Sequence, residues 1–231
     1  MKHNVLLSAL LVVSCASVSV GQEKASGEEY IAKDLPCDIV FVKRVQTRSE
    51  VLYNTRFTAG GNLFVLRRDG TLHNLTRLKA GDVSDPDVSY DGKRILFSMM
   101  KDKTDWWHVY EIRPDGTGLR QLTSGDHDNV DPCYLPNGQI CFCSNRTGIL
   151  NEYEMQRAEL LHVMDADGSN VRQISFFLSG DYNPMVLHDG RLLWMRYEHH
   201  GEMDFFPLVV ARTDGSNTEE FFGVKGPVPR S

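Results

Sequence analysis

Three short stretches of this chain hold the side chains that could bind a ligand. Residues 125–129 combine carboxylate and imidazole groups, and residues 198–204 carry two adjacent histidines among three acidic residues. Residues 106–108 begin with two tryptophans, whose rings could stack on a sugar or cover the edge of a sheet. The candidate ligand-binding side chains are Trp106, Trp107, Asp126, His127, Asp128, Glu198, His199 and His200. Solvated loops and ordinary aromatic packing are the alternative interpretations of the same residues.

We predict no metal site and no catalytic residue in these stretches. Adjacent side chains in a strand-flanking loop point apart, so His199 and His200 are poorly placed to hold one metal ion together. The chain also lacks a Gly-x-Ser-x-Gly sequence and a glycine-rich phosphate loop. We therefore expect no cofactor, and no catalytic activity from this chain alone.

The elements that must position these stretches repeat along the chain. An Asp-Gly pair recurs at intervals of 46, 52 and 47 residues, beginning at 69, 115, 167 and 214. An Asp-Pro or Asn-Pro pair follows the first three of these after 16 residues, and a second Asp-Gly or Asn-Gly pair follows them after 22. Self-similarity with this period indicates a repeat fold, in which each unit buries its apolar faces against its neighbours.

Residues 85–123 form the clearest repeat and predict four short antiparallel strands. Asp91-Gly92 and Asp115-Gly116 each lie between two strand-length segments, and we expect two-residue hairpins with positive φ angles there. Four strands in this length are typical of one β-propeller blade. The predicted fold is therefore all-β, a β-propeller of four-stranded antiparallel blades. Its blades are expected at residues 38–78, 82–124, 128–176 and 181–222. The Asp-Pro and Asn-Pro pairs are interpreted as scaffold at the start of each inner strand.

Length varies only between the second and third strands of each repeat. The loops there, at residues 99–107, 145–158 and 197–206, should lie on one face of the propeller. The turns at 91–92, 137–138 and 189–190 should lie on the opposite face. Because repeat proteins collect their insertions on one face, often the binding face, we expect a ligand on the loop face.

The repeat resembles a known family in several segments. Residues 85–98, Asp-Pro-Asp-Val-Ser-Tyr-Asp-Gly-Lys-Arg-Ile-Leu-Phe-Ser, resemble the WD40-like (PD40) repeat of TolB-type propellers. Residues 131–146 and 164–172 resemble exported bacterial proteins that share the middle domain of the hydrazine synthase alpha subunit. The resemblance covers about residues 38–222 and implies the propeller fold. Haem chemistry is not implied, because c-type haem is attached through Cys-x-x-Cys-His and this chain has no such sequence.

The N-terminal residues are those of an export signal. An apolar run from Val5 to Val13 follows Lys2 and is too short to span a bilayer, so residues 1–21 are predicted to be a signal peptide. Residues 12–15 resemble a lipobox, which would make Cys15 a lipidated N-terminus; ordinary cleavage after Gly21 is the alternative. Residues 22–37 are expected to be a linker. We expect an exported protein, periplasmic or on the cell surface, that meets the membrane only through this lipid anchor.

The spacing of the repeats predicts a propeller whose ring of blades is incomplete. Asp38–Arg44 is predicted to be strand two of the first blade, which leaves that blade without an inner strand. The next Asp-Pro pair would begin at 230, and residues 223–231 are predicted to be a tail. We therefore expect about four blades in an incomplete or open propeller, prone to dimerise or aggregate unless a longer chain or a partner completes it.

Charge and cysteine content limit the partners and cross-links. A net charge of −6 and an isoelectric point near 5.7 argue against nucleic-acid binding. Centring a hairpin on residues 137–138 brings Cys133 opposite Cys141, so a disulfide there and two buried free thiols are both open. The predicted function is an exported binding or assembly module, with a protein, small molecule or saccharide on the loop face. The alternative is an enzyme or enzyme subunit, either metal-dependent or completed by a missing domain, related to hydrazine synthase alpha-like proteins but without haem.

Overall fold

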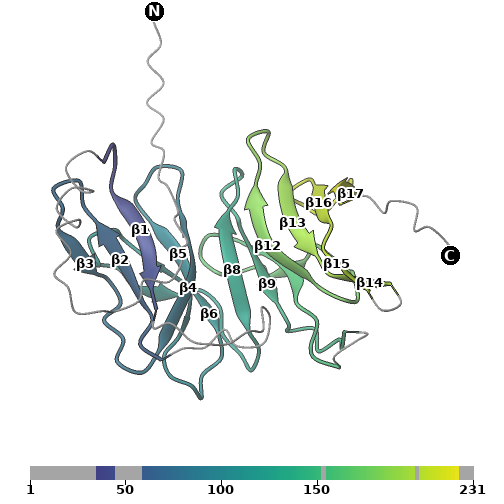
Figure 1. Cartoon of the computed structure of the whole chain (residues 1–231), viewed down its shortest axis with the longest axis horizontal. Helices are drawn as coiled ribbons and strands as arrows, with labels where there is room; N and C mark the ends of the chain where they lie inside the picture. The colour runs from purple at the N-terminus through teal and green to yellow at the C-terminus, as the bar shows by residue number, and fades with distance from the viewer. Residues whose placement is uncertain (1–34, 45–58, 152–154, 201–202, 224–231) are drawn as a thin grey trace, which may run out of the picture. The chain divides into compact units, whose positions relative to one another are not determined.

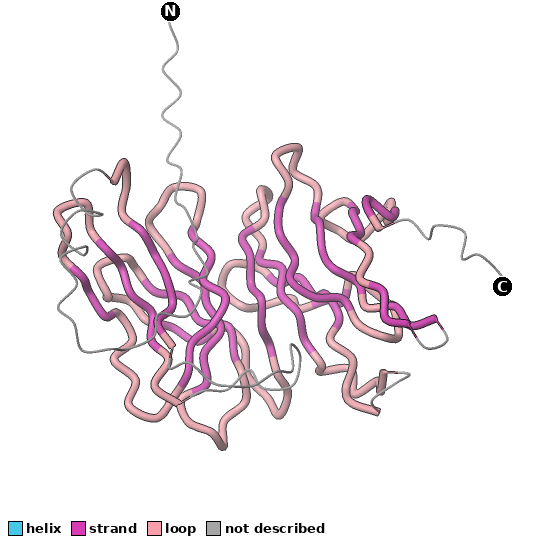
Figure 2. The backbone as a smooth tube through the Cα atoms, viewed as in Figure 1, coloured by secondary structure: helices cyan, strands magenta, loops and turns pink. Residues whose placement is uncertain are grey.

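The chain is built from short antiparallel strands, as its repeat predicts. The computed structural model describes residues 35–44, 59–151, 155–200 and 203–223, and within these ranges it holds seventeen strands and no helix (Figure 1, Figure 2). No membrane-crossing helix is therefore present in the described ranges. The all-β class and the blade architecture are confirmed.

Two compact units divide the described residues, and the first comprises residues up to 105 together with 109–121. It holds one three-stranded and one four-stranded sheet, each in chain order. Their strands are β1 (Ile39–Lys43), β2 (Asn62–Leu66), β3 (Leu72–Asn74), β4 (Asp82–Val88), β5 (Ile95–Met100), β6 (His108–Ile112) and β7 (Arg120–Gln121). In the described part of the chain β1 pairs with β2 alone.

The second unit comprises residues 106–108 and those from 122 onward. It holds two four-stranded sheets and a small two-stranded hairpin, β14–β15, which is inserted between the second and third strands of the fourth blade. The strands are β8 (Asn129–Tyr134), β9 (Ile140–Ser144), β10 (Leu160–Met164), β11 (Arg172–Gln173), β12 (Asp181–Val186), β13 (Leu192–Arg196), β14 (Glu198–His200), β15 (Met203–Phe205), β16 (Leu208–Ala211) and β17 (Glu219–Phe222). All strands lie inside the blade ranges expected from the sequence.

The turn geometry corrects one sequence prediction. In the Asp-Gly and Asn-Gly pairs only the glycine has a positive φ angle. The hairpin around Asp115 closes with the amide of Arg113 donating to Thr117, while the amide of Gly116 donates back to Arg113. This is a three-residue loop, a type I turn followed by a left-handed glycine, rather than a two-residue hairpin. The Asp115 carboxylate accepts hydrogen bonds from the amide and hydroxyl of Thr117, at 2.8 and 2.7 Å, which stabilises the turn.

The Asp-Pro and Asn-Pro pairs mark bulges rather than strand starts. β4, β8 and β12 begin two or three residues earlier, and each shows a register shift at the pair. Asp85, Asp131 and Asn183 have φ angles of 53°, 51° and 52°, an uncommon region for residues other than glycine. The Asp85 carboxylate accepts hydrogen bonds from the hydroxyls of Ser84 and Ser98, at 2.7 and 3.1 Å. The pairs are scaffold, as expected, but their role is to bulge the inner strand.

The middle strands of the sheets form the cores. β5, β9 and β10 are buried along their whole length and read as continuous apolar runs, which is typical of strands covered on both faces. In the first unit Val40, Leu63, Ile95, Phe97 and Ile112 belong to one buried cluster. The predicted loop at 99–107 starts later, because Met99 and Met100 continue β5 and are buried.

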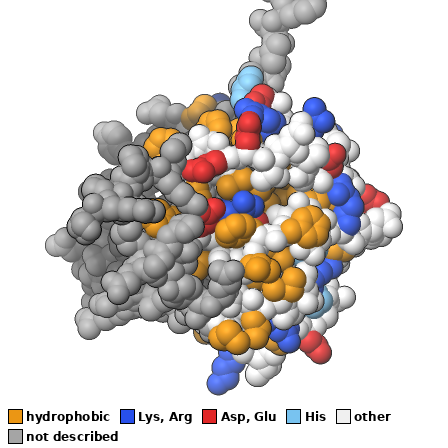
Figure 3. Space-filling model, turned by 90° about the vertical axis from the view of Figure 1, so that its right-hand side faces the viewer, with side chains coloured by type: hydrophobic (Ala, Val, Ile, Leu, Met, Phe, Trp, Pro, Cys, Tyr) orange, Lys and Arg blue, Asp and Glu red, His pale blue; other side chains and the backbone are white. Residues whose placement is uncertain are grey.

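The inner strand of the fourth blade exposes a large apolar side chain. Met185 follows the bulge of β12 and is 53% exposed, whereas Cys133, at the same position of β8, is 7% exposed. β12 packs against β8 and β9 and covers the third blade, but among the described residues no further strand covers β12 in the same way. Figure 3 shows hydrophobic side chains gathered on the surface of this part of the chain.

Within each four-stranded blade, antiparallel order places both tight turns at one end and the loop between the second and third strands at the other. The described parts of the loops 145–158 and 197–206 thus lie opposite the turns of their own blades, which agrees with the prediction. The second of these is not wholly irregular, since it contains the β14–β15 hairpin.

Candidate functional site

Two of the three candidate stretches meet in the second unit. The first is residues 125–129, which lead into β8 and are called the 125–129 crossing below. It lies against the segment that precedes β6, where the amide of Trp107 donates to Asp128 Oδ1 at 3.1 Å. The amide of Asn129 in turn donates to the carbonyl of Trp107 at 2.8 Å. The third stretch, with Glu198, His199 and His200, lies on β14 of a different blade.

Asp128 holds the crossing against the end of β9. Its amide donates to Asn145 Oδ1 at 2.9 Å, and Asn145 Nδ2 donates back to Asp128 Oδ2 at 3.1 Å. With Trp107 on its other oxygen, the Asp128 carboxylate is bonded on both sides. Its role in the described structure is to position the crossing.

Asn129 is the buried centre of the arrangement, with no exposed surface. Its Nδ2 donates to the carbonyl of His127 at 3.1 Å and lies 3.2 Å from His108 Nδ1. Its Oδ1 accepts hydrogen bonds from Ser144 Oγ at 3.0 Å and Arg146 Nη2 at 2.7 Å. One amide thus links the crossing to the strand β9 and to an arginine that the sequence analysis did not single out.

Arg146 is half-buried and bonded only to neutral groups. Its Nη2 donates to Asn129, and its Nε donates to Ser144 Oγ at 3.1 Å. The guanidinium lies over the ring of Phe142, 5.2 Å from its centroid. Burial lowers the pKa of Arg146 below its ordinary value, but a guanidinium stays charged.

Arginines at the ends of two other second strands meet carboxylates at the starts of inner strands instead. Arg196 Nε donates to the fully buried Asp181 at 2.8 Å, and Trp194 Nε1 donates to the same oxygen at 2.7 Å. In the first unit Arg44 pairs with the buried Asp82 at 2.8 Å. In the third blade the corresponding first residue of the inner strand is Asn129, which carries no charge.

His127 contributes an unsatisfied nitrogen beside Arg146. Its Nε2 is buried and has no hydrogen-bond partner in the described part of the chain. The ring lies so close to Gly125 that a Cβ there would be 2.5 Å from Cε1, which explains a residue without a side chain at this position. Burial lowers the pKa of His127, and the charges of Arg146, His108 and Arg157 lower it further. The Asp128 carboxylate raises this pKa, but its effect is smaller, so the neutral ring is favoured.

Arg157 completes the group from the loop after β9. Its Nη1 donates to the carbonyl of Asp126 at 3.1 Å, and its guanidinium lies 5.8 Å from the Trp106 ring centroid. The Asp126 side chain itself is exposed. Around the crossing the chain therefore gathers two guanidinium groups, a neutral imidazole and a partly exposed tryptophan.

Other predicted sites are only partly described. No group of three or more metal-ligating side chains occurs in the described ranges. Cys133 lies directly opposite Cys141 in the β8–β9 register, as predicted, and both are buried with no disulfide between them in this structure. Cys15 lies outside the described residues, as do the side chains of His199 and His200.

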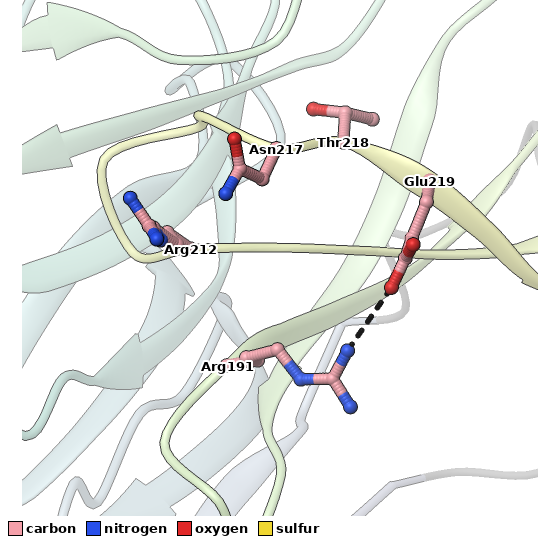
Figure 4. Close-up of a pocket in the computed structure, with 5 residues that line it drawn as sticks. All are labelled: Arg191, Arg212, Asn217, Thr218 and Glu219. Carbon is pink, nitrogen blue, oxygen red and sulfur yellow. Dashed lines mark hydrogen bonds and ion pairs between the residues drawn. The ribbon is translucent and has the colours of Figure 1, made fainter.

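A shallow depression of about 450 Å³ occurs at the opposite end of the fourth blade, where the sequence predicted no ligand (Figure 4). It is lined by Arg191, Arg212, Asn217, Thr218 and Glu219. Arg191 donates to Glu219 at 3.2 Å and also pairs with Asp189 at 2.8 Å. Two carboxylates therefore neutralise the guanidinium nearest the depression, and it is a weaker site than the crossing.

Comparisons with known proteins agree on the fold. The hydrazine synthase of Kuenenia stuttgartiensis superimposes with a TM-score of 0.72 at 19% identity, covering 83% of this chain and 32% of that one. A TolB-like protein of Agrobacterium tumefaciens gives 0.56 at 21% identity over 70% of this chain and 56% of that one, and TolB of Acinetobacter baumannii gives 0.52 at 16% identity over 69% and 37%.

In sequence, hydrazine synthase subunit alpha of Kuenenia stuttgartiensis is 21% identical over 51% of this chain. This chain spans about a fifth of that protein's length, 21%. No protein-family model matches. At these identities the likeness shows the fold, a β-propeller of the TolB type, and leaves the activity to the site.

Proposed function

We propose that this chain is an exported propeller module that binds a ligand without chemical change, at the loop end of its third blade. The observation that carries the proposal is the 125–129 crossing. Asp128 and Asn129 hold it from both sides, yet His127 Nε2 stays buried without a hydrogen-bond partner in the described part of the chain. A buried polar atom that stays unsatisfied is costly, and a bound ligand would supply the missing bond.

Three further features support a binding role. Trp106 is 37% exposed beside Arg157 and offers an aromatic surface. The site lies where the strand order places the variable loop of the third blade. Export is supported by the apolar run after Lys2, with periplasmic or surface location following from it.

A second candidate function is that of an enzyme subunit. It is favoured by the structural likeness to a chain named hydrazine synthase, of which this chain covers 32%. In this alternative the propeller would position a catalytic domain or a metal that the described residues do not hold. Metal bound in stoichiometric amount by the purified protein, and lost on His127→Ala or on replacing His199 and His200, would favour it.

The binding proposal is tested by a thermal-shift screen of anions, neutral saccharides, amines and peptides, followed by calorimetry. We expect at least one class to bind the natural sequence and to lose affinity in His127→Ala. The matched control is His188→Ala, an exposed histidine in the β12–β13 turn of the fourth blade. Binding that is equal in both variants, or that is lost only in the control, would contradict the proposed site.

A further inference from the structure

Arg146 differs electrostatically from the other shielded arginines of this chain. Of the described arginines that are not exposed, Arg146 alone has no carboxylate within ion-pair distance. The others are paired as Arg67 with Asp38, Arg120 with Glu111, Arg191 with Asp189 and Glu219, and Arg196 with Asp181. A half-buried charge without a counter-ion is unfavourable, because its lost hydration is not repaid by a nearby opposite charge.

The bonding of Arg146 leaves donors for an external group. Its Nε and Nη2 donate to Ser144 and Asn129, and Nη1 has no partner in the described part of the chain. These two bonds fix the plane of the guanidinium, and the Phe142 ring supports it from one side. A fixed guanidinium fork suits an anion with two or more oxygens, because it can donate parallel charge-assisted hydrogen bonds.

The neighbouring groups also fit an anion. Arg157 adds a second guanidinium without an ion pair, and His127 adds an unpartnered ring nitrogen. The nearest carboxylate on the crossing, Asp128, is already bonded to Trp107 and Asn145. Asp126 and Asp128 place two carboxylates on the crossing itself, so the case for an anion rests on the missing ion pair of Arg146 and not on an excess of positive charge.

We propose that Arg146, His127 and Arg157 form a binding site for an oxyanion, the carboxylate or phosphate group of a small molecule. The ligand supplies the negative charge that Asp181 supplies to Arg196 in the fourth blade. This inference rests on the proposed binding function and specifies its ligand class. Trp106, beside Arg157, would contact the remainder of the molecule.

Citrate and inorganic phosphate are suitable probes, titrated at constant ionic strength with chloride as the balancing anion. We expect saturable binding by calorimetry and a matching rise in melting temperature. Arg146→Gln should weaken binding by about tenfold or more, because a charge-assisted hydrogen bond is lost. Arg157→Gln should weaken it severalfold, and since Arg157 is exposed this variant should keep its fold. Arg146→Lys should retain part of the affinity.

The matched control is Arg212→Gln, which removes an arginine from the depression in the fourth blade and should leave binding unchanged. Citrate binding without phosphate binding would identify a carboxylate ligand, and the reverse a phosphate. The inference is overturned if neither probe binds, if the effect follows ionic strength alone, or if Arg146→Gln and Arg157→Gln bind as the natural sequence does. A neutral ligand that is lost in His127→Ala but kept in Arg146→Gln would leave the proposed function standing and refute the oxyanion.

Discussion

At the scale of single residues, the substitution of one acceptor for another decides the character of the site. Asp181 neutralises Arg196 inside the fourth blade, while Asn129 bonds Arg146 in the third without neutralising it. The two amino acids have nearly the same shape and differ by one charge. The same local geometry therefore gives a closed structural ion pair in one blade and an open cationic site in the other.

Another residue-scale feature, the buried His162, predicts how stability depends on pH. Burial lowers its pKa to about 4, and the nearby charges of Arg146 and His127 act in the same direction. The unfolded chain takes up this proton near the ordinary value of 6.5, before the folded chain does. The contribution of the neutral His162 to the free energy of unfolding is thus fully present above pH 6.5 and is lost as the pH falls towards 4.

We expect His162 to account for about 2 kcal/mol of lost unfolding free energy between pH 7 and pH 5. Urea unfolding at the two pH values measures it, and His162→Gln should reduce the loss by that amount. The exposed His188→Gln should leave the loss unchanged. A natural sequence and His162→Gln with equal pH dependence would show that the imidazole is not held neutral by the fold.

At the scale of elements, the tight turns are alike in backbone but not in surroundings. Gly138 and Gly168 have φ angles of 86° and 91° in equivalent three-residue loops. A Cβ at Gly138 would meet nothing within 4 Å, whereas a Cβ at Gly168 would lie 2.4 Å from the carbonyl oxygen of Leu122. The second turn therefore packs against the backbone of another segment.

Gly138→Ala should destabilise the protein by about 1–2 kcal/mol, the cost of a left-handed backbone for a residue with a side chain. Gly168→Ala should cost about 1–3 kcal/mol more, because the Leu122 backbone must also move. Urea unfolding of both variants at neutral pH tests this difference. Equal losses would mean that the contact with Leu122 does not constrain the turn.

At the scale of the whole molecule, exposed apolar side chains predict solution behaviour. On the fourth blade and the segment before it, Phe176, Met185 and Phe222 are 75%, 53% and 70% exposed. Large apolar side chains that are exposed to solvent promote association. We therefore expect the isolated chain to associate as its concentration rises.

Sedimentation velocity at increasing concentration tests this expectation. The double substitution Phe176→Ser with Met185→Gln should reduce association without lowering the melting temperature. Leu72→Gln, which changes an equally exposed residue of the first blade, should have little effect. A monodisperse monomer at every concentration, with a single sharp melting transition, would contradict the prediction.

The sequence by itself determined the repeat, the strand order within each blade and the end of the blade that carries the long loops. These depend on contacts between residues close in sequence: turn glycines, side chains that cap turns, and apolar runs of strand length. The sequence also indicated Trp106, Trp107 and the 125–129 crossing as candidates, because tryptophan, histidine and aspartate are residue types that commonly bind ligands.

Only the tertiary structure decided which of these residues form a site. The hairpin register brings Asn129 near Ser144, but only the three-dimensional structure shows that its amide oxygen also accepts a hydrogen bond from Arg146. Whether an arginine has a carboxylate within ion-pair distance likewise depends on residues that are close in space but distant in sequence, so the sequence alone does not show it. The inner strands also start before their Asp-Pro pairs, because hydrogen bonds to the adjacent strand extend them.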